Sequence, residues 1–338
     1  MLTGSGPLLD ENGVLREAGW ANSLVYDYSP DMVKTKKKRI KEWDYYLIIN
    51  HEGKFAVSFT VDDNRYMGLV NCNVFDFEQR KKISCGDFIV APNGSLGLPV
   101  TSEKGDISYT TKYYDYHIDR TDTGRHIYCK YNECYKYEET EVDIYLDCPP
   151  MDTMVIATPW SEDRTAFYYN QKITCMPAKG YVRIKDKTYT FDSSVDYGML
   201  DWGRGVWTYS NTWYWGIGSA NVNGKPFGYN IGYGFGDTTN ASENMLFYDG
   251  KSHKLDLVDF GIPTGNVMDT WIMTSSDKRF NIKFEPFFND HTDFGVGLIW
   301  ERADKVFGKL NGTVVLDDGT VLEIKDVVGF HEKVFHKW

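Results

Sequence analysis

The chain has 338 residues, of which 25% are charged and 42% apolar, the composition of a globular protein with an apolar core. Its formal net charge of −11 at pH 7 argues against nucleic acid as the main partner, because phosphate binding requires a positive surface. A chain of this length usually exceeds a single core, so we expect two domains.

Short runs of β-branched and aromatic residues follow one another along the chain, separated by turn residues. In the first half these runs cover 43–50, 54–61, 107–119, 125–132 and 141–148. In the second half, Asn223-Gly224 and Asp318-Gly319 each separate two such runs, as two-residue hairpin turns do. The pattern predicts an antiparallel β-meander. Amphipathic helical patterns are few, and the best of them covers 29–43.

An antiparallel chain must protect the edges of its sheets, and closing each sheet into a barrel does so. Roughly twenty strands do not fit one small barrel, whereas two barrels of about eight to ten strands do. We therefore predict an all-β protein of two packed antiparallel barrels. The first barrel is expected over residues 1–175 and the second over 176–338, with the boundary at the Pro- and Gly-containing "CMPAKG" (175–180).

Several features bear on compartment and partners. No apolar run reaches the ~18–20 residues of a membrane helix, and the start of the chain lacks the pattern of a secretory signal. We therefore expect a cytoplasmic protein with no integral membrane segment. The cysteines are scattered, which predicts free thiols: Cys72, Cys85, Cys129, Cys134, Cys148 and Cys175. The basic run "KTKKKRIK" (34–41) is interpreted as a solvated strand or helix end, with an anionic-ligand patch as the alternative.

No motif points to a metal or a cofactor. No His, Cys, Asp and Glu residues have metal-ligand spacing, and no phosphate-binding or dinucleotide glycine motif follows a strand and opens a helix. The sequence predicts neither a metal ion nor a cofactor.

The segment 201–216, "DWGRGVWTYSNTWYWG", concentrates aromatic residues. We interpret its start as a sharp turn, or a close backbone approach, permitted by Gly203 and Gly205. In the following strand one face carries Trp207, Tyr209, Asn211, Trp213 and Trp215. Three indole N–H groups on one face require acceptors, unlike a core of Val, Ile and Leu. This face is therefore predicted to line a ligand pocket, and an aromatic core is the alternative.

The next strand repeats the aromatic pattern. Tyr229 and Tyr233 belong to its aromatic face, and Asn230 lies on the opposite, glycine-rich face. We predict that these three residues and Trp202 also contact the ligand, with Asn230 orienting a polar end. Aromatic–glycine packing between neighbouring strands is the alternative.

Four charged residues are candidates for catalysis. Asp201 and Arg204 are expected to face a common region, where an ion pair between them is the structural alternative. An Asp201 carboxyl buried in an apolar pocket would have a raised pKa and could donate a proton. Asp237 and Glu243 are further candidate acids, for which turn and capping roles are the alternative.

The motifs also carry a family resemblance, densest over 165–338. They are "YNQKITCMPAKGYV" (169–182), "LDWGRGVWTYSNTWYWG" (200–216), "FGYNIGYGFGD" (227–237), "ENMLFYDGKSHKLD" (243–256), "FGKLNGTVVLDDG" (307–319) and the closing "GFHEKVFHKW". In this order they resemble the family catalogued as domain of unknown function 2804, and "RIKEWDYY" (39–46) extends the likeness to the first half.

More distantly, the Asp-aromatic-Gly segment followed by a Trp-rich strand resembles the tandem lipocalin-like proteins. That group includes carotenoid 1,2-hydratases, tocopherol cyclases and fungal Diels–Alderases. The resemblance implies two lipocalin-like, calycin-type barrels with a pocket for an apolar ligand. The hydratases carry an Asp-His-x-Trp-Gly pattern, to which only Asp201 of the segment 201–205 corresponds.

Three functions follow as hypotheses. The first is a cofactor-independent hydratase, cyclase or isomerase that uses acid catalysis on a terpenoid, polyene or lipid. The second is a binding protein that carries a hydrophobic ligand without turnover. The third is a carbohydrate-active enzyme with Trp and Tyr platforms, which requires two carboxylates about 5–10 Å apart.

Overall fold

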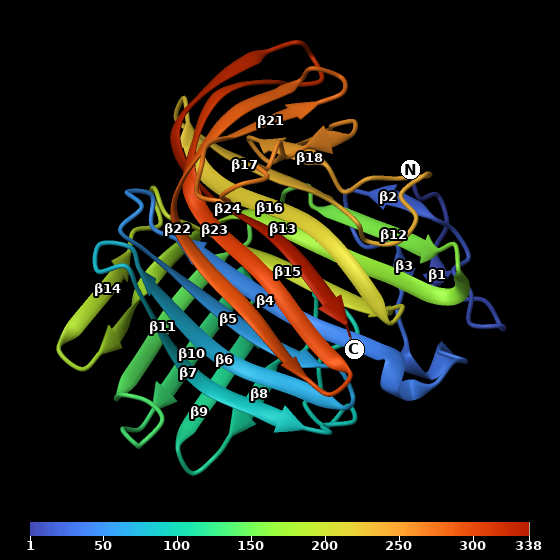
Figure 1. Ribbon diagram of the computed structural model, residues 1–338, viewed down its shortest axis with the longest axis horizontal. Coiled ribbons are helices and arrows are strands. Elements are labelled where there is room, and N and C mark those ends of the chain that lie inside the picture. The colour runs from blue at the N-terminus through green and yellow to red at the C-terminus, as the bar shows by residue number, and fades with distance from the viewer. Residues whose placement is uncertain (338) are drawn as a thin grey trace.

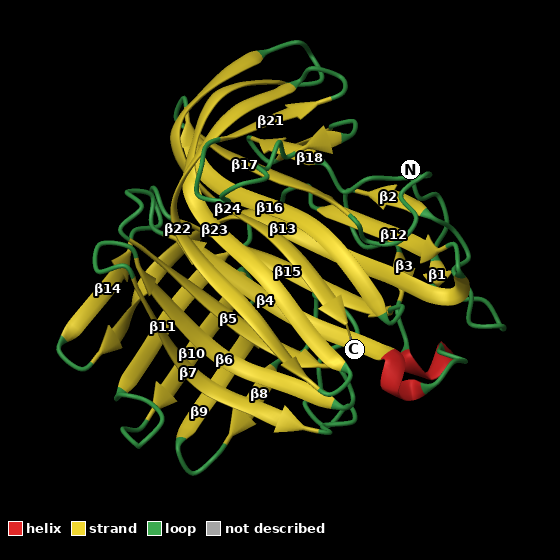
Figure 2. Ribbon diagram, viewed as in Figure 1, coloured by secondary structure: helices red, strands yellow, loops and turns green. Residues whose placement is uncertain are grey.

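The computed structural model describes residues 1–337, and its architecture is all-β, as predicted (Figure 1). The only helical segments among these residues are two 3-10 turns, η1 (Pro30–Met32) and η2 (Lys37–Arg39), drawn red in Figure 2. Neither is long or apolar enough to cross a bilayer. The helical pattern over 29–43 therefore yields only these turns, because strand β4 begins at Ile40.

The strands form two large antiparallel sheets. The first sheet has 13 strands, with β7-β6-β5-β4-β15-β13-β11-β10-β9-β8 in spatial order and β12, β14 and β2 attached beside β13 and β12. Their bounds are β2 (Gly19–Ala21), β4 (Ile40–Ile49), β5 (Phe55–Asp63), β6 (Met67–Asp76), β7 (Lys81–Val90), β8 (Ile107–Thr110), β9 (Tyr114–Arg120), β10 (Gly124–Tyr131), β11 (Thr140–Asp147), β12 (Met154–Trp160), β13 (Asp163–Ile184), β14 (Lys187–Phe191) and β15 (Tyr197–Val206).

The second sheet has nine strands, in the order β19-β18-β17-β16-β24-β23-β22-β21-β20. They are β16 (Ser210–Val222), β17 (Lys225–Tyr233), β18 (Met245–Tyr248), β19 (Lys251–Lys254), β20 (Val258–Asp259), β21 (Trp271–Ser275), β22 (Phe280–Val296), β23 (Ile299–Val315) and β24 (Val321–Lys337). A separate parallel pair joins β1 (Gly6–Pro7) to β3 (Tyr26–Asp27). Both large sheets curl into half-barrels, which confirms the prediction of two packed, lipocalin-like antiparallel units.

The chain passes from the first sheet to the second between Val206 and Ser210. This crossing lies later than the boundary expected at residue 175. Position 175 instead falls inside the long strand β13, where Cys175 has a positive φ of 57° and the pairing with β15 shifts its register. The Pro- and Gly-containing segment therefore bends a strand.

Strict alternation of side chains along the strands creates three apolar cores. One fills the interior of the first sheet, one fills the interior of the second, and the third lies where the two sheets pack face to face. We call this third region the inter-sheet layer. On β4, for example, Leu47 and Ile49 point into the layer, whereas Tyr46 and Ile48 point into the first interior. In Figure 1 the red and orange strands of the second sheet cross over the green and blue strands of the first.

The glycines at the start of the aromatic segment permit close packing and form no turn. Gly203 and Gly205 lie inside β15, and neither has a positive φ. A Cβ at Gly203 would lie 2.1 Å from the indole of Trp43, so that ring packs directly on the glycine. Of the two interpretations of the sequence, close backbone approach is the one that holds.

Replacing Gly203 with Ala should therefore destabilise the protein. The added methyl group must displace the Trp43 indole, and overpacking of this kind costs about 1–3 kcal/mol of unfolding free energy. Denaturant unfolding measures the loss. Gly265→Ala is the matched control, since a Cβ there meets no atom within 4 Å, and its stability should be unchanged. Equal stability of the two variants would contradict this packing.

Candidate functional site

A buried ion pair occupies the inter-sheet layer at the start of the aromatic segment. Asp201 on β15 pairs across the ladder with Lys172 on β13, and Lys172 Nζ lies 2.7 Å from Asp201 Oδ1. The amide Nδ2 of Asn170 donates to the same oxygen at 2.6 Å. Lys172 is only 1% exposed, and its ammonium lies 4.3 Å from the centre of the Trp215 ring. These contacts give the Asp201 carboxyl a cationic partner and an amide donor inside the layer.

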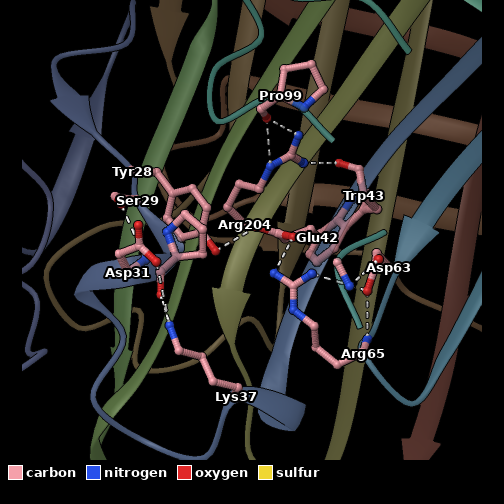
Figure 3. Close-up of polar contacts among 12 residues, drawn as sticks. Tyr28, Ser29, Asp31, Lys37, Glu42, Trp43, Asp63, Arg65, Pro99 and Arg204 are labelled. Carbon is pink, nitrogen blue, oxygen red and sulfur yellow. Dashed lines mark hydrogen bonds and ion pairs between the residues drawn. The ribbon is translucent and has the colours of Figure 1, made fainter. Parts of the chain in front are cut away.

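Arg204 lies on the opposite face of the same strand, which corrects the expectation that it shares a region with Asp201. Residues 201 and 204 are separated by an odd number of positions, so alternation sends their side chains to opposite faces. Figure 3 shows Arg204 donating to the carbonyl oxygens of Trp43 and Pro99. Its guanidinium also pairs with Asp44 at 2.8 Å. Arg204 is therefore a structural residue of the first interior.

Trp202 is on that same interior face. Its ring lies 4.5 Å from the Arg204 guanidinium, and it packs edge-on against Tyr169. Its predicted contact with a ligand in the layer is therefore incompatible with its position.

Glu243 reaches the inter-sheet layer from the segment just before β18. The neighbouring Asn244 fixes this segment, since its Oδ1 accepts from the backbone N–H of Gly232 at 2.8 Å. Glu243 Oε1 then lies 2.3 Å from the position that a Cβ at Gly232 would take, so only glycine fits there. Asn230 Nδ2 donates to the Glu243 backbone carbonyl at 2.9 Å and approaches Oε2 at 3.4 Å.

Burial raises the pKa of Glu243 to about 7. The Lys172 ammonium opposes this shift, and the Asp201 carboxylate adds to it. The carboxyl therefore exchanges its proton close to neutral pH, as a general acid requires.

The aromatic wall of the layer is held by amide and carboxylate acceptors, as the indole N–H groups require. Trp215 Nε1 donates to Asn230 Oδ1 at 2.7 Å, and Trp213 Nε1 donates to Glu332 at 2.8 Å. Trp207 packs edge-on against Trp213, with ring centres 5.4 Å apart. Asn211 stabilises the turn before β16, where it accepts from Trp160 Nε1 and donates to the Thr208 carbonyl.

Besides Trp202, three of the aromatic residues predicted to bind a ligand lie outside the layer. Tyr209 falls in the turn before β16, is 45% exposed and donates to the Leu298 carbonyl. Tyr229 and Tyr233 point into the second interior, where Tyr229 stacks on His331 and Tyr233 on Tyr214. The predicted common face thus comprises Asn211, Trp213 and Trp215 on β16, with Trp207 in the preceding turn.

Three buried polar atoms of this layer lack a hydrogen-bond partner among residues 1–337. They are the hydroxyl of Tyr168, Oδ1 of Asn170 and Oε1 of Glu243. An unsatisfied buried polar atom costs about 1–3 kcal/mol, and native structures contain few of them. These three atoms beside one ion pair are therefore candidates to hydrogen-bond a polar group of a ligand.

An open hollow of about 920 Å³ lies next to the buried cluster. Trp160, Asp237, Ser242 and Lys254 are among its lining residues, and Ser242 directly precedes Glu243. Gly234 and Gly236 also line the hollow, and Phe235 between them in the sequence stacks on Tyr168 with ring centres 4.9 Å apart. The carboxylate of Asp237 is at the rim, where hydrogen bonds from the hydroxyl and N–H of Thr239 lower its pKa. Those bonds favour the turn role for Asp237.

Sequence reasoning missed Lys172, Asn170 and Tyr168. All three lie at even positions of β13, within the motif "YNQKITCMPAKGYV" or directly before it. The available signal was the polar run Asn170-Gln171-Lys172, which directly follows three aromatic residues in a strand pattern. Within residues 1–337, no three His, Cys, Asp or Glu side chains are grouped as a metal site requires, and all six cysteines are free thiols.

Lys172→Met should destabilise the protein by about 3–5 kcal/mol, because it leaves the Asp201 charge buried without its partner. The double variant Lys172→Met, Asp201→Asn removes that charge as well and should recover most of the loss. Denaturant unfolding of the three proteins measures both effects. A single-variant loss below about 1 kcal/mol would show that the pair is not buried as described.

Solved structures align with nearly the whole of this chain at low sequence identity. A protein from Nitrosomonas europaea, provisionally named AttH, aligns with a TM-score of 0.53 and 12% identity over 94% of this chain and 99% of its own. Kievitone hydratase from Nectria haematococca aligns with a TM-score of 0.50 and 10% identity over 98% of both chains. CghA, solved with Sch210972, aligns at 0.44 and 11% identity over 97% of both chains.

Among the curated proteins, no sequence matches this chain significantly. A family model, in contrast, covers it completely and agrees with the resemblance carried by its motifs. The model described as "Domain of unknown function (DUF2804)" matches residues 1–338, and the chain belongs to that family.

Proposed function

We propose that this protein is a cofactor-independent acid–base enzyme, of the hydratase, cyclase or isomerase type, acting on a hydrophobic small molecule with a C=C bond. The observation that carries the proposal is the Glu243 carboxyl, which is 2% exposed and has a pKa raised to about 7. Its Oε1 forms no hydrogen bond with residues 1–337, so a substrate that reached the layer would meet an unpartnered carboxyl oxygen. Burial next to aromatic rings suits an apolar substrate.

The reaction begins with protonation of the substrate. The O–H bond of the Glu243 carboxyl breaks as the π electrons of the alkene form a C–H bond, which leaves a carbocation and a carboxylate. Addition of water, with return of one proton to Glu243, gives a hydrated product. Transfer of a neighbouring proton to the Glu243 carboxylate gives an isomer. Attack by a second C=C bond closes a ring and moves the positive charge to a new carbon, which then loses a proton to the same carboxylate. Aromatic faces in the layer stabilise the cation.

Asp201 then has a positioning role, in place of the proton-donor role expected from the sequence. Its ion pair with Lys172 gives each of the two buried groups a partner of opposite charge. Its negative charge helps to raise the pKa of Glu243, and its contact with Asn170 fixes that amide. The free Oδ1 of Asn170 and the Tyr168 hydroxyl are suited to bind a hydroxyl or carbonyl group of the substrate.

We infer that a substrate enters from the open hollow past Phe235, whose flanking glycines line that hollow. This residue stands between Gly234 and Gly236, which have φ angles of 95° and 75°, in the region that favours glycine. Its movement would uncover the face of Tyr168 on which it stacks. The fold shared with kievitone hydratase is compatible with hydration chemistry, and it does not by itself assign a substrate.

The test uses whatever apolar compound copurifies with the protein, extracted with organic solvent and identified by mass spectrometry. Incubated with the protein in D₂O, the compound should gain one carbon-bound deuterium per turnover. Glu243→Gln should slow this incorporation by at least 100-fold, since general acid catalysis contributes about 10²–10⁴-fold. Glu323→Gln, at an exposed position on β24, is the matched control and should retain full activity.

Recovery of the compound without deuterium after prolonged incubation would instead identify a carrier that performs no chemistry. Equal turnover by Glu243→Gln would assign the acid to another residue.

The pH dependence follows from the protonation state that the reaction requires. Protonated Glu243 is the acid, so kcat/KM should be constant below pH 7 and fall tenfold per pH unit above about 7. A pH–rate profile from pH 5 to 9 measures this. A rate that increases above pH 7 would mean that Glu243 acts as the base in its carboxylate form.

A further inference from the structure

The hairpin between β22 and β23 ends in a cluster of exposed apolar side chains. The sequence at this turn is "FGVGLIW" (294–300). Its four most exposed large residues are Phe294 (56%), Val296 (62%), Leu298 (79%) and Trp300 (45%). They lie at the end of a long antiparallel pair, and no core cluster includes them. We call this cluster the apolar tip.

A chain of contacts connects the apolar tip to the basic run of the sequence. Tyr209 donates to the Leu298 carbonyl at 2.7 Å. In the same turn, the Trp207 carbonyl accepts from Nη2 of Arg39 at 2.9 Å, and Arg39 is the last residue of η2. In Figure 2 the red helical turns and the β22–β23 turn lie at the same end of the molecule.

The lysines at this end carry uncompensated charge. Lys36 and Lys38 are exposed, and neither forms an ion pair with any of residues 1–337, whereas Arg39 is paired with Asp163 at 2.6 Å. Lys37 lies 4.0 Å from the exposed Asp31. The chain as a whole carries a charge of −11, so free lysines beside exposed apolar groups distinguish this end.

An apolar hollow of about 840 Å³ adjoins the same lysines. Lys36, Lys37 and Lys38 line it together with Leu98 and Val100. Val100 is 49% exposed, and the neighbouring strand β7 ends in Val90, which is 79% exposed. Lysines are thus flanked by exposed apolar groups on two sides.

We propose that this end of the molecule docks on an anionic lipid bilayer, with the apolar tip inserted among the headgroups and Lys36 and Lys38 facing the lipid charge. A protruding turn with Phe and Trp fits the interfacial region, where aromatic side chains partition favourably. Basic residues within a Debye length of an anionic surface add to the attraction. The proposal goes beyond the enzymatic one and does not depend on Glu243.

Flotation of the full chain with vesicles tests the proposal. Vesicles of phosphatidylcholine with 30% phosphatidylglycerol should carry the wild-type protein upward through a density gradient. The double variant Val296→Glu, Leu298→Glu should lose at least tenfold in vesicle partitioning, because it places two charges in the apolar tip. The matched control is Val321→Glu, which is 61% exposed at the opposite end of β24 and should float like the wild type.

The lysines are tested with Lys36→Gln, Lys38→Gln. Each lysine near an anionic surface is worth about 1 kcal/mol, so this variant should lose about thirtyfold in partitioning on the anionic vesicles. On vesicles of phosphatidylcholine alone it should match the wild type. Thermal melts of all variants establish that each is folded.

Two outcomes would overturn the proposal. One is a wild-type chain that fails to float with either vesicle composition. The other is equal flotation of the wild type and the tip variant. Sedimentation analysis without lipid completes the test, since a wild-type dimer that the tip variant converts to monomers would identify the apolar tip as a contact between copies of this chain.

Discussion

The packing of two sheets face to face is the constraint on which the site depends, because it buries the side chains that point into the inter-sheet layer. A charged group survives there only with a partner or by losing its charge. Asp201 follows the first course, through Lys172 and Asn170. Glu243 follows the second, since burial raises its pKa to about 7. Two carboxyl groups in one layer thus have different surroundings, since one is paired with an ammonium and the other has an unpartnered oxygen, and this difference favours Glu243 as the acid.

Alternation along the strands explains both what the sequence predicts and where prediction ends. The period of two and the turn residues predict the β architecture, and they assign Trp213 and Trp215 correctly to one face. The same rule, applied from Asp201, would have separated it from Arg204. The interpretation of 201–205 as a turn prevented that, whereas these residues continue β15. The assignment of Tyr209 to the same face was wrong because alternation was applied to a residue outside the strand. Strand β16 begins only at Ser210.

The remaining parts of the site arise from pairing between distant segments, which a single sequence does not specify. Lys172 meets Asp201 through the register of β13 on β15. The sequence motif identifies Glu243 as a candidate acid. Its burial depends on the contact between the adjacent Asn244 and Gly232 of strand β17. The basic run at 34–41 is recognisable in the sequence. Its connection to the apolar tip through Tyr209 is visible only in the folded structure. Composition identifies reactive residues, and topology decides which of them meet.

The ionisation of Glu243 in the intact protein tests the central claim most directly. Carbon-13 NMR of protein labelled at the glutamate side-chain carboxyl, titrated from pH 4 to 9, follows it, and Glu243→Gln assigns the resonance by its disappearance. The account predicts a titration midpoint near pH 7, well above the ordinary 4.5 of a glutamate. A midpoint at or below 4.5 would contradict it, because Glu243 would then be a carboxylate at neutral pH with no proton to donate.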